Sequence, residues 1–320
     1  MEVAAYCPVD YPGDRLAYDS LRLHSQHIDT AAAFLFRIEA SGRVSGWDDT
    51  RLHAVAKEKE FRLEAVVHNF SGGAFKPGLV EPFLVTLRGR GTAAQAIVDL
   101  VVSCGYDGAN IDFEGLSPSM RPYFSLFVRN LAGRLKAAGR SLTVTVPAKT
   151  RDNPWDSWSG AYDYAALASV ADRLIIMAYD EHWAGGTPGP IASLPWVERV
   201  SDYAAGAVEP RKILLGVPQY SYDWPASGGP ARYITTPEAL RIARETGATI
   251  MWDSIAQVPH YYYWRGGEKR HVYMENAYSL AFKLRTARAH GFTGIAMWRL
   301  GFEDPSAWDL IASYRRSASN

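Results

Sequence analysis

Acidic side chains gather in one short stretch of the chain, GYDGANIDFEGL, at residues 105–116. Asp107, Asp112 and Glu114 alternate there with small or apolar residues. Side chains of a β-strand alternate between its two faces, so Asp112 and Glu114 share one face with Asn110. Two carboxyl groups that can influence each other are suited to general acid–base catalysis. The alternative is an acidic cluster in a loop or at a helix start, without a chemical role.

Short apolar runs rich in β-forming residues recur along the chain, and helical patterns lie between most of them. Continuous apolar runs are typical of parallel strands that are buried on both faces. We predict strands at Val3–Tyr6, Ala31–Ile38, Leu63–His68, Ala109–Asp112, Leu142–Val146, Leu174–Ala178, Ile213–Val217 and Gly294–Trp298. We predict helices at Ala93–Cys104, Pro118–Ala138, Tyr164–Val170, Leu194–Ala205 and Asn276–His290. This alternation predicts an α/β fold, a (β/α)₈ TIM barrel, with a doubly wound open sheet as the alternative.

The barrel gives the acidic strand a direction. Ala109, Ile111 and Phe113 suit the layer beneath the helices, which leaves the polar face for the barrel interior. Glu114 then comes last, at the C-terminal mouth where barrel enzymes place their chemistry.

One interval interrupts the alternation of strands and helices. Residues 218–293 hold more than one helix, with a helical pattern at Glu238–Glu245 and strand patterns at Thr249–Trp252, Tyr261–Trp264 and His271–Met274. We predict a small α+β insertion at about 225–275, between the seventh and eighth strands of a single catalytic domain covering 1–320.

The acidic stretch resembles the signature of glycoside hydrolase family 18, the chitinase-like barrel enzymes, which is D-G-x-D-x-D-x-E. Residues 107–114 follow this pattern except at Asn110, where many chitinases carry Asp. Residues 176–180 (IMAYD) resemble the family's M-x-Y-D motif, and residues 215–220 (LGVPQY) resemble its G-x-P-x-Y strand. Residues 294–298 (GIAMW) resemble its eighth strand, which ends in the tryptophan floor of the sugar site.

The resemblance implies a role for each catalytic candidate. Glu114 would be the general acid, which requires a raised pKa. The family does not use a second carboxylate as nucleophile, because the substrate's own N-acetyl oxygen attacks the anomeric carbon. Asp112 would orient that acetamide and stabilise the charge on its nitrogen, and Tyr179 would donate to its oxygen. The implied reaction is hydrolysis with retention at a 2-acetamido sugar.

Further residues are expected around these three. We expect Asn110 to hold Asp112 by hydrogen bonds and Asp107 to brace the strand entrance as structural support. Trp298 would form the floor of the −1 sugar site. Asp180 would either contact the sugar or brace the site. The remaining substrate-binding candidates, each of which could equally be a satisfied core residue, are Gln219, Tyr220, Tyr6 and Asn69.

Charge and composition limit the partners. The chain has 34 basic and 34 acidic residues and no basic block, so nucleic acid has no electrostatic support as a partner. No apolar run is long enough to span a bilayer, so no membrane partner is expected. Histidines and cysteines show no metal-ligand spacing, and no glycine loop cradles phosphate, so we expect no metal and no cofactor.

Two further segments resemble one branch of the family and so narrow the expected substrate class. Residues 179–198 and 294–311 resemble the branch from spore-forming bacteria that includes cortex-lytic N-acetylglucosaminidases and germination hydrolases. This resemblance implies a monomeric enzyme that acts on N-acetylglucosamine-containing glycan, namely peptidoglycan of the spore cortex. It also implies a location in the spore envelope or outside the cell. The first ten residues, MEVAAYCPVD, do not have the anatomy of a signal peptide. Hydrolysis of chitin oligosaccharides and sugar binding without catalysis are the alternatives.

Overall fold

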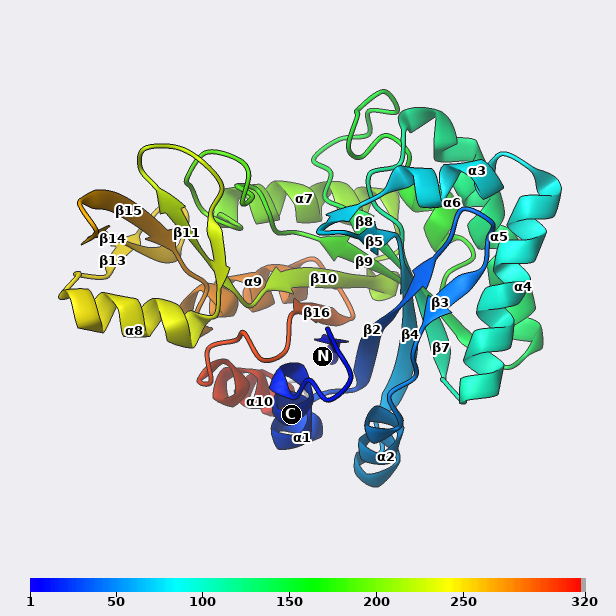
Figure 1. The fold of residues 1–320 in the computed structure, drawn as a ribbon, viewed down its shortest axis with the longest axis horizontal. Helices are drawn as coiled ribbons and strands as arrows, with labels where there is room; N and C mark the ends of the chain where they lie inside the picture. The colour runs from blue at the N-terminus through cyan, green and yellow to red at the C-terminus, as the bar shows by residue number, and fades with distance from the viewer. Residues whose placement is uncertain (318–320) are drawn as a thin grey trace.

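The computed structural model describes residues 1–317 and contains a closed barrel of parallel strands surrounded by helices (Figure 1). Neighbouring strands follow the order β1-β16-β10-β9-β8-β7-β4-β2, and the pairing of β1 with β2 closes the ring. This confirms the predicted TIM barrel and excludes the open sheet. The barrel strands are β1 (Glu2–Pro8), β2 (Thr30–Ile38), β4 (Arg62–His68), β7 (Gly108–Asp112), β8 (Ser141–Pro147), β9 (Arg173–Met177), β10 (Ile213–Pro218) and β16 (Gly294–Trp298).

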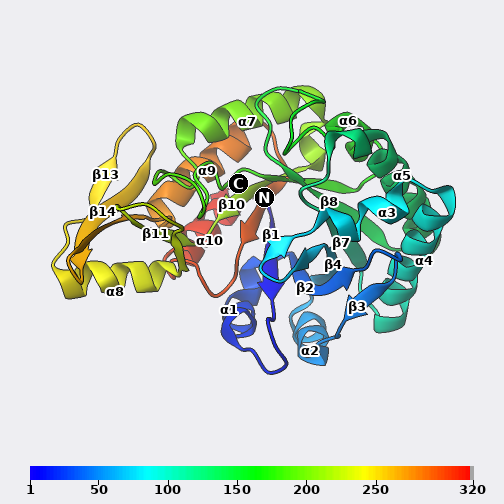
Figure 2. The ribbon, with the colours of Figure 1, turned by 45° about the horizontal axis from the view of Figure 1, so that its top comes forward.

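Helices cover the outside of the barrel (Figure 2). They are α1 (Leu16–His24), α2 (Thr50–Lys59), α3 (Glu81–Leu84), α4 (Leu87–Cys104), α5 (Arg121–Ala137), α6 (Tyr164–Ala168), α7 (Leu194–Ala207), α9 (Ala277–Ala289) and α10 (Ala307–Ser317). Several begin at side chains that accept a hydrogen bond from the first turn, such as Asp163 before α6 and Asn276 before α9. Short strands β3 (Val44–Gly46), β5 (Phe70–Ser71) and β6 (Ala74–Phe75) lie near the mouth and rim.

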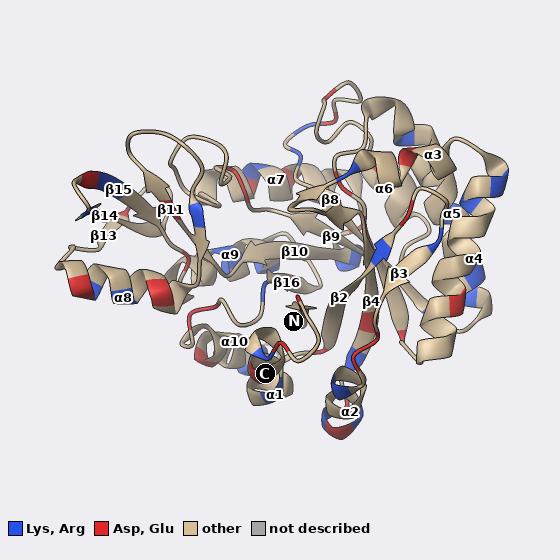
Figure 3. Ribbon diagram, in the orientation of Figure 1, with Lys and Arg blue, Asp and Glu red and all other residues tan. Residues whose placement is uncertain are grey.

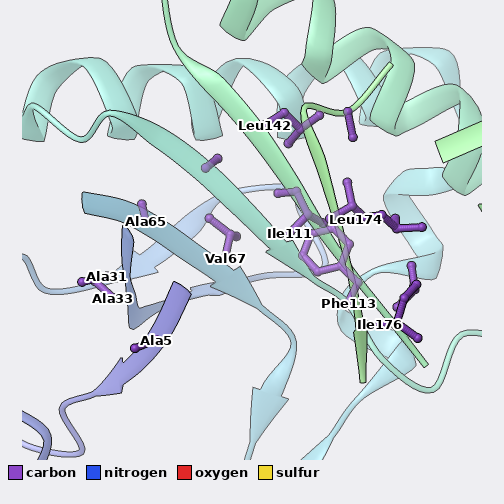
Figure 4. Close-up of a cluster of buried hydrophobic side chains, with 14 of the residues drawn as sticks. Ala5, Ala31, Ala33, Ala65, Val67, Ile111, Phe113, Leu142, Leu174 and Ile176 are labelled. Carbon is purple, nitrogen blue, oxygen red and sulfur yellow. The ribbon is translucent and has the colours of Figure 1, made fainter. Parts of the chain in front are cut away.

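The core has two layers that meet at the strands. Ile111 and Phe113 belong to the outer layer between strands and helices (Figure 4), where Phe113 lies 5.8 Å, ring centre to ring centre, from Phe127 of α5. The barrel interior is a smaller cluster that includes Tyr6 and Ala296. The two faces of β7 therefore point as the alternation of its residues predicts.

A second, antiparallel sheet follows β10 and extends to one side of the barrel (Figures 1 and 2). Its order is β12-β11-β15-β14-β13, and α8 (Thr236–Thr246) packs against it. The strands are β11 (Ser221–Pro225), β12 (Arg232–Ile234), β13 (Met251–Asp253), β14 (Val258–Arg265) and β15 (Glu268–Tyr273). Tyr261 and Tyr263 are buried between this sheet and α8, so they form part of the insertion's own core.

Basic and acidic residues are interspersed on the helices. In Figure 3, α2, α4 and α8 each carry Lys or Arg beside Asp or Glu. Among residues 1–317, no helix is both long and apolar enough to cross a membrane.

Candidate active site

The carboxyl pair stands at the C-terminal end of β7. Asp112 is the last residue of that strand, and Glu114 follows two residues later on the same face. Their residues are only 3% and 8% exposed. The local fold holds Glu114 firmly, because the Asn69 side chain donates to its carbonyl oxygen and accepts from its amide, both at 2.9 Å.

Asn69 therefore acts on the backbone of Glu114. Its amide group is engaged on both sides and is fully buried, so the structure favours a positioning role over the expected contact with substrate. Tyr162 adds a second restraint, because its hydroxyl donates to the Phe113 carbonyl oxygen at 2.8 Å. These three hydrogen bonds fix the turn that carries the acid.

The electrostatics of the pair favour protons on both carboxyl groups. Burial raises the pKa of Asp112 to about 7. Burial, followed by the negative charges of Asp112 and Asp180, raises the pKa of Glu114 well above its ordinary value. Because the charge of Asp112 raises the pKa of Glu114, an ionised Asp112 favours a protonated Glu114, which is the division of roles that acid catalysis beside a stabilising carboxylate requires.

Asn110 does not hold Asp112 as expected. Its Oδ1 accepts from the Thr145 hydroxyl at 3.0 Å, and Thr145 is in turn 2.6 Å from the Tyr6 hydroxyl. Within residues 1–317, neither Asn110 Nδ2 nor Asp112 Oδ1 has a hydrogen-bond partner. The bond to Thr145, on neighbouring β8, engages only the Oδ1 of Asn110 and leaves its Nδ2 group free. Two buried polar atoms on successive steps of one face are thus left for a ligand.

Tyr179 and Asp180 approach from the end of β9. Tyr179 is half-buried, and burial together with the negative charges around it raises the pKa of its hydroxyl, which stays a hydrogen-bond donor. Asp180 is exposed and takes a left-handed backbone, with φ of 60°. Its Oδ1 accepts from the hydroxyls of Tyr220 and Tyr222. Tyr220 therefore braces Asp180 and lies in an aromatic cluster.

Trp298 closes the site from the end of β16. Its indole is half-buried and stands edge-on to Tyr6 and Phe34, with ring centres 5.2 and 5.4 Å away. The backbone carbonyl oxygen of Trp298 accepts from the backbone N–H of Gln219 at 2.7 Å, and this bond links the ends of β10 and β16. Gln219 itself is 3% exposed. These contacts fix the plane of the indole at the mouth.

Asp107 lies at the other end of β7. Its Oδ2 accepts from the Leu63 amide at 2.8 Å, and its own amide donates to the Leu63 carbonyl oxygen. The side chain thus joins the starts of β4 and β7, far along the strand from Glu114.

Sequence reasoning missed three residues that support the site: Thr145, Tyr162 and Tyr222. Thr145 follows the alternation of β8, and Tyr222 lies two residues after Tyr220, so period two could have identified both. Tyr162 lies in the long loop after β8, where no periodic pattern applies. Among residues 1–317, no group of three or more His, Cys, Asp or Glu side chains is arranged to hold a metal ion.

The profile of glycosyl hydrolases family 18 matches residues 38–303. The chain belongs to this family. It is a glycoside hydrolase of the chitinase-like group, related to cortex-lytic enzymes and to chitinases.

Three proteins illustrate which members of the family this chain is similar to. The chain is 36% identical over 252 residues to "Putative sporulation-specific glycosylase YdhD" of Bacillus subtilis, a match that covers 77% of this chain but only 59% of that relative. The solved structure of the spore cortex-lytic enzyme SleL of Bacillus cereus superposes with a TM-score of 0.90 at 26% identity, over 98% of this chain and 73% of that one. A chitinase from Chromobacterium violaceum superposes with a TM-score of 0.89 at 28% identity, over 97% and 98%.

Proposed function

We propose that the protein hydrolyses the β-1,4 bond after N-acetylglucosamine in peptidoglycan, in the spore cortex, with retention of configuration and by substrate-assisted catalysis. The observation that carries this proposal is the buried carboxyl pair at the end of β7, in which Asp112 Oδ1 has no partner among residues 1–317. A buried carboxylate without a partner is costly in a folded protein, and a substrate group that donates to it removes that cost.

In the first step, Glu114 donates its proton to the glycosidic oxygen as the bond to the anomeric carbon breaks. Burial and the negative charges of Asp112 and Asp180 raise the pKa of Glu114, which favours the protonated form that this step needs. The hydrogen bonds from Asn69 and Tyr162 fix the backbone at Glu114, so the position from which the acid projects is set before substrate arrives.

The attacking group is the carbonyl oxygen of the substrate's own acetamide. Ionised Asp112 accepts the acetamide N–H through its free oxygen and stabilises the positive charge that develops on the nitrogen as the ring closes. Tyr179, a hydroxyl donor beside the pair, binds the acetamide oxygen and directs it at the anomeric carbon. Water then opens the bicyclic intermediate from the face that the leaving group occupied, and the Glu114 carboxylate takes a proton from that water.

Peptidoglycan is favoured over chitin by the kinship with a spore cortex-lytic enzyme and a sporulation-named glycosylase. The same relatives support the spore envelope as the location of the activity. Chitin oligosaccharides are the second candidate, because the chitinase from Chromobacterium violaceum resembles this chain over nearly its whole length.

The test is a parallel digestion of purified spore cortex and chitin oligosaccharides, with mass analysis of new reducing ends. Cortex fragments that end in reducing N-acetylglucosamine are expected, and Glu114→Gln should produce none. Cleavage of chitin oligosaccharides alone would show that the protein is a chitinase and not a peptidoglycan hydrolase. Binding without cleavage of either would contradict hydrolysis and leave a sugar-binding protein.

A further inference from the structure

The Arg299 side chain has a buried Nε without a hydrogen-bond partner among residues 1–317. The residue is 8% exposed and follows Trp298 directly at the barrel mouth. Its Nε is buried without a partner, and within residues 1–317 no atom accepts a hydrogen bond from any nitrogen of its side chain. A buried donor normally has a hydrogen-bond partner, because removing a polar N–H from water without one is costly. The mechanism proposed above makes no use of this residue.

The surroundings of Arg299 connect it to the catalytic site. Its guanidinium carbon lies 4.7 Å from the ring centre of Phe302, which stacks on Tyr233 at 4.8 Å. Tyr233 is 38% exposed and its ring lies 4.8 Å from that of Tyr220, which donates to Asp180. Phe302 and Trp298 also pack against the same aromatic cluster. Arg299 therefore lies on the same side of the mouth as the sugar floor, beside an open aromatic surface.

The carboxylate that pairs with Arg299 does not hydrogen-bond to it. Asp10, in the loop after β1, places Oδ2 at 3.7 Å from Arg299 Nη1, and that aspartate side chain is 66% exposed. This distance exceeds that of a hydrogen bond. An exposed partner in water contributes little to holding a charge, so the pair leaves the donors of Arg299 available.

We infer that Arg299 is a specificity-determining residue that binds the carbonyl oxygen of the 3-O-lactyl substituent on the muramic acid next to the −1 sugar. The inference rests on the proposed function and deepens it. Chitin and the peptidoglycan glycan share one β-1,4 backbone of 2-acetamido sugars and differ by this substituent on alternate sugars. The lactyl group carries a carbonyl oxygen whether it is a free acid, an amide or a lactam, so one guanidinium serves all three forms.

The experiment compares two ligands of equal length that differ in that substituent. Chitotetraose and the tetrasaccharide of alternating N-acetylglucosamine and N-acetylmuramic acid are titrated into the Glu114→Gln protein by calorimetry, with and without Arg299→Met. Loss of a charge-assisted hydrogen bond in a buried site should weaken binding of the muramic ligand about 10- to 100-fold. The loss for chitotetraose should be at least ten times smaller. The ratio of kcat/KM for the two substrates should shift in the same direction in the protein that retains Glu114.

Two matched variants separate recognition from packing. Arg140 also has a buried Nε without a partner and lies between α5 and β8, at the opposite end of the barrel, so Arg140→Met should leave the ligand ratio unchanged. Asp10→Asn removes the long ion pair but keeps Arg299, and it should preserve or strengthen the muramic preference. Melting temperatures report the folding of each variant.

Three results would overturn the inference. Equal losses for both ligands would show that Arg299 only supports the mouth, and no loss for either would show that it is not used. A muramic-specific loss in Asp10→Asn equal to that of Arg299→Met would assign the effect to the ion pair. Because binding is measured without turnover, a protein that cleaves only chitin would contradict the proposed function while these titrations still decide the role of Arg299.

Discussion

Two regions of the molecule bury a carboxylate at a strand, and they treat it in opposite ways. In the insertion, Asp223 of β11 has no exposed surface and accepts from Arg270 Nε at 2.7 Å, Tyr263 at 2.8 Å and Arg232 Nη1 at 3.1 Å. At the barrel mouth, Asp112 and Glu114 are almost as buried, yet among residues 1–317 no hydrogen bond reaches either carboxyl group. Burial alone thus does not distinguish these acids, whereas the lack of any hydrogen bond to the carboxyl group separates Asp112 and Glu114 from Asp223.

The physical meaning of the difference is in the cost of the charge. Asp223 is part of a satisfied network that joins β11, β12, β14 and β15, so it contributes to holding the insertion together. At the mouth, no protein group stabilises the charged form of Asp112 or Glu114, and burial therefore raises the pKa of both carboxyl groups. Strain of this kind is retained where a ligand relieves it.

The largest expected effect follows from Glu114→Gln. Removing the proton donor should lower kcat about 10²- to 10⁴-fold on any accepted glycan. Circular dichroism and melting temperature should show an intact fold, because the amide keeps the shape of the side chain. Turnover within threefold of the unmodified protein would refute the role of Glu114.

Asp112→Asn should have the next largest effect, a fall in kcat/KM of about 10²- to 10³-fold, as for removal of one stabilising group at a developing charge. In the unmodified protein kcat/KM should decline as pH falls below the pKa of Asp112, about 7 in the free enzyme, because the ionised form is required. A pH–rate profile of both proteins checks this. The acidic decline should be missing in the variant, and its persistence there would assign it to another group.

Asp223→Asn is the matched substitution in the insertion, and the comparison predicts the opposite result. Leaving two arginines beside a neutral amide should cost about 3–5 kcal/mol of unfolding free energy. Activity per folded molecule, assayed well below the melting temperature, should remain within about threefold, since Asp223 touches no reacting group. A variant of normal stability but without activity would remove the distinction between the two regions.

The stability of the Asp112→Asn variant should depend on pH. Asp112 has a folded-state pKa of about 7 against an ordinary 3.8, so the folded state holds a proton that the unfolded chain releases. Its contribution to stability is greatest below pH 4 and is lost as pH rises to about 7. Asp112→Asn should therefore be more stable than the unmodified protein above pH 7, by roughly 1–4 kcal/mol, and the gain should vanish near pH 4. Urea unfolding at pH 4, 6 and 8 measures this, and a gain that grows toward low pH would contradict the assigned pKa direction.

The smallest effect is expected from Asn110→Asp, which restores the residue that many chitinases carry. A second buried negative charge beside Asp112 disfavours its ionisation, so the acidic limb of kcat/KM should move to higher pH while the maximum stays within about threefold. A maximum lowered more than a hundredfold would show that the free amide of Asn110 is itself required.

The sequence was sufficient for the barrel and for the carboxyl pair. Continuous apolar runs predicted all eight barrel strands, and period two placed Phe113 under the helices and Glu114 at the mouth. The strands β11 and β12 were missed, because Asp223 in β11 is an acidic residue whose partners come from residues 232, 263 and 270 and are not visible locally. The bond expected between Asn110 and Asp112 is absent, and the partner that Asn110 does have, Thr145, comes from the neighbouring strand and is likewise not visible locally.

The central claim, that the unpartnered pair performs substrate-assisted hydrolysis, is tested most directly by proton NMR of the anomer first released from a glycan substrate. Retention should give the β-anomer first, followed by slow mutarotation, and Glu114→Gln should release neither. Initial release of the α-anomer would mean that Asp112 activates water for an inverting attack, and it would contradict the account.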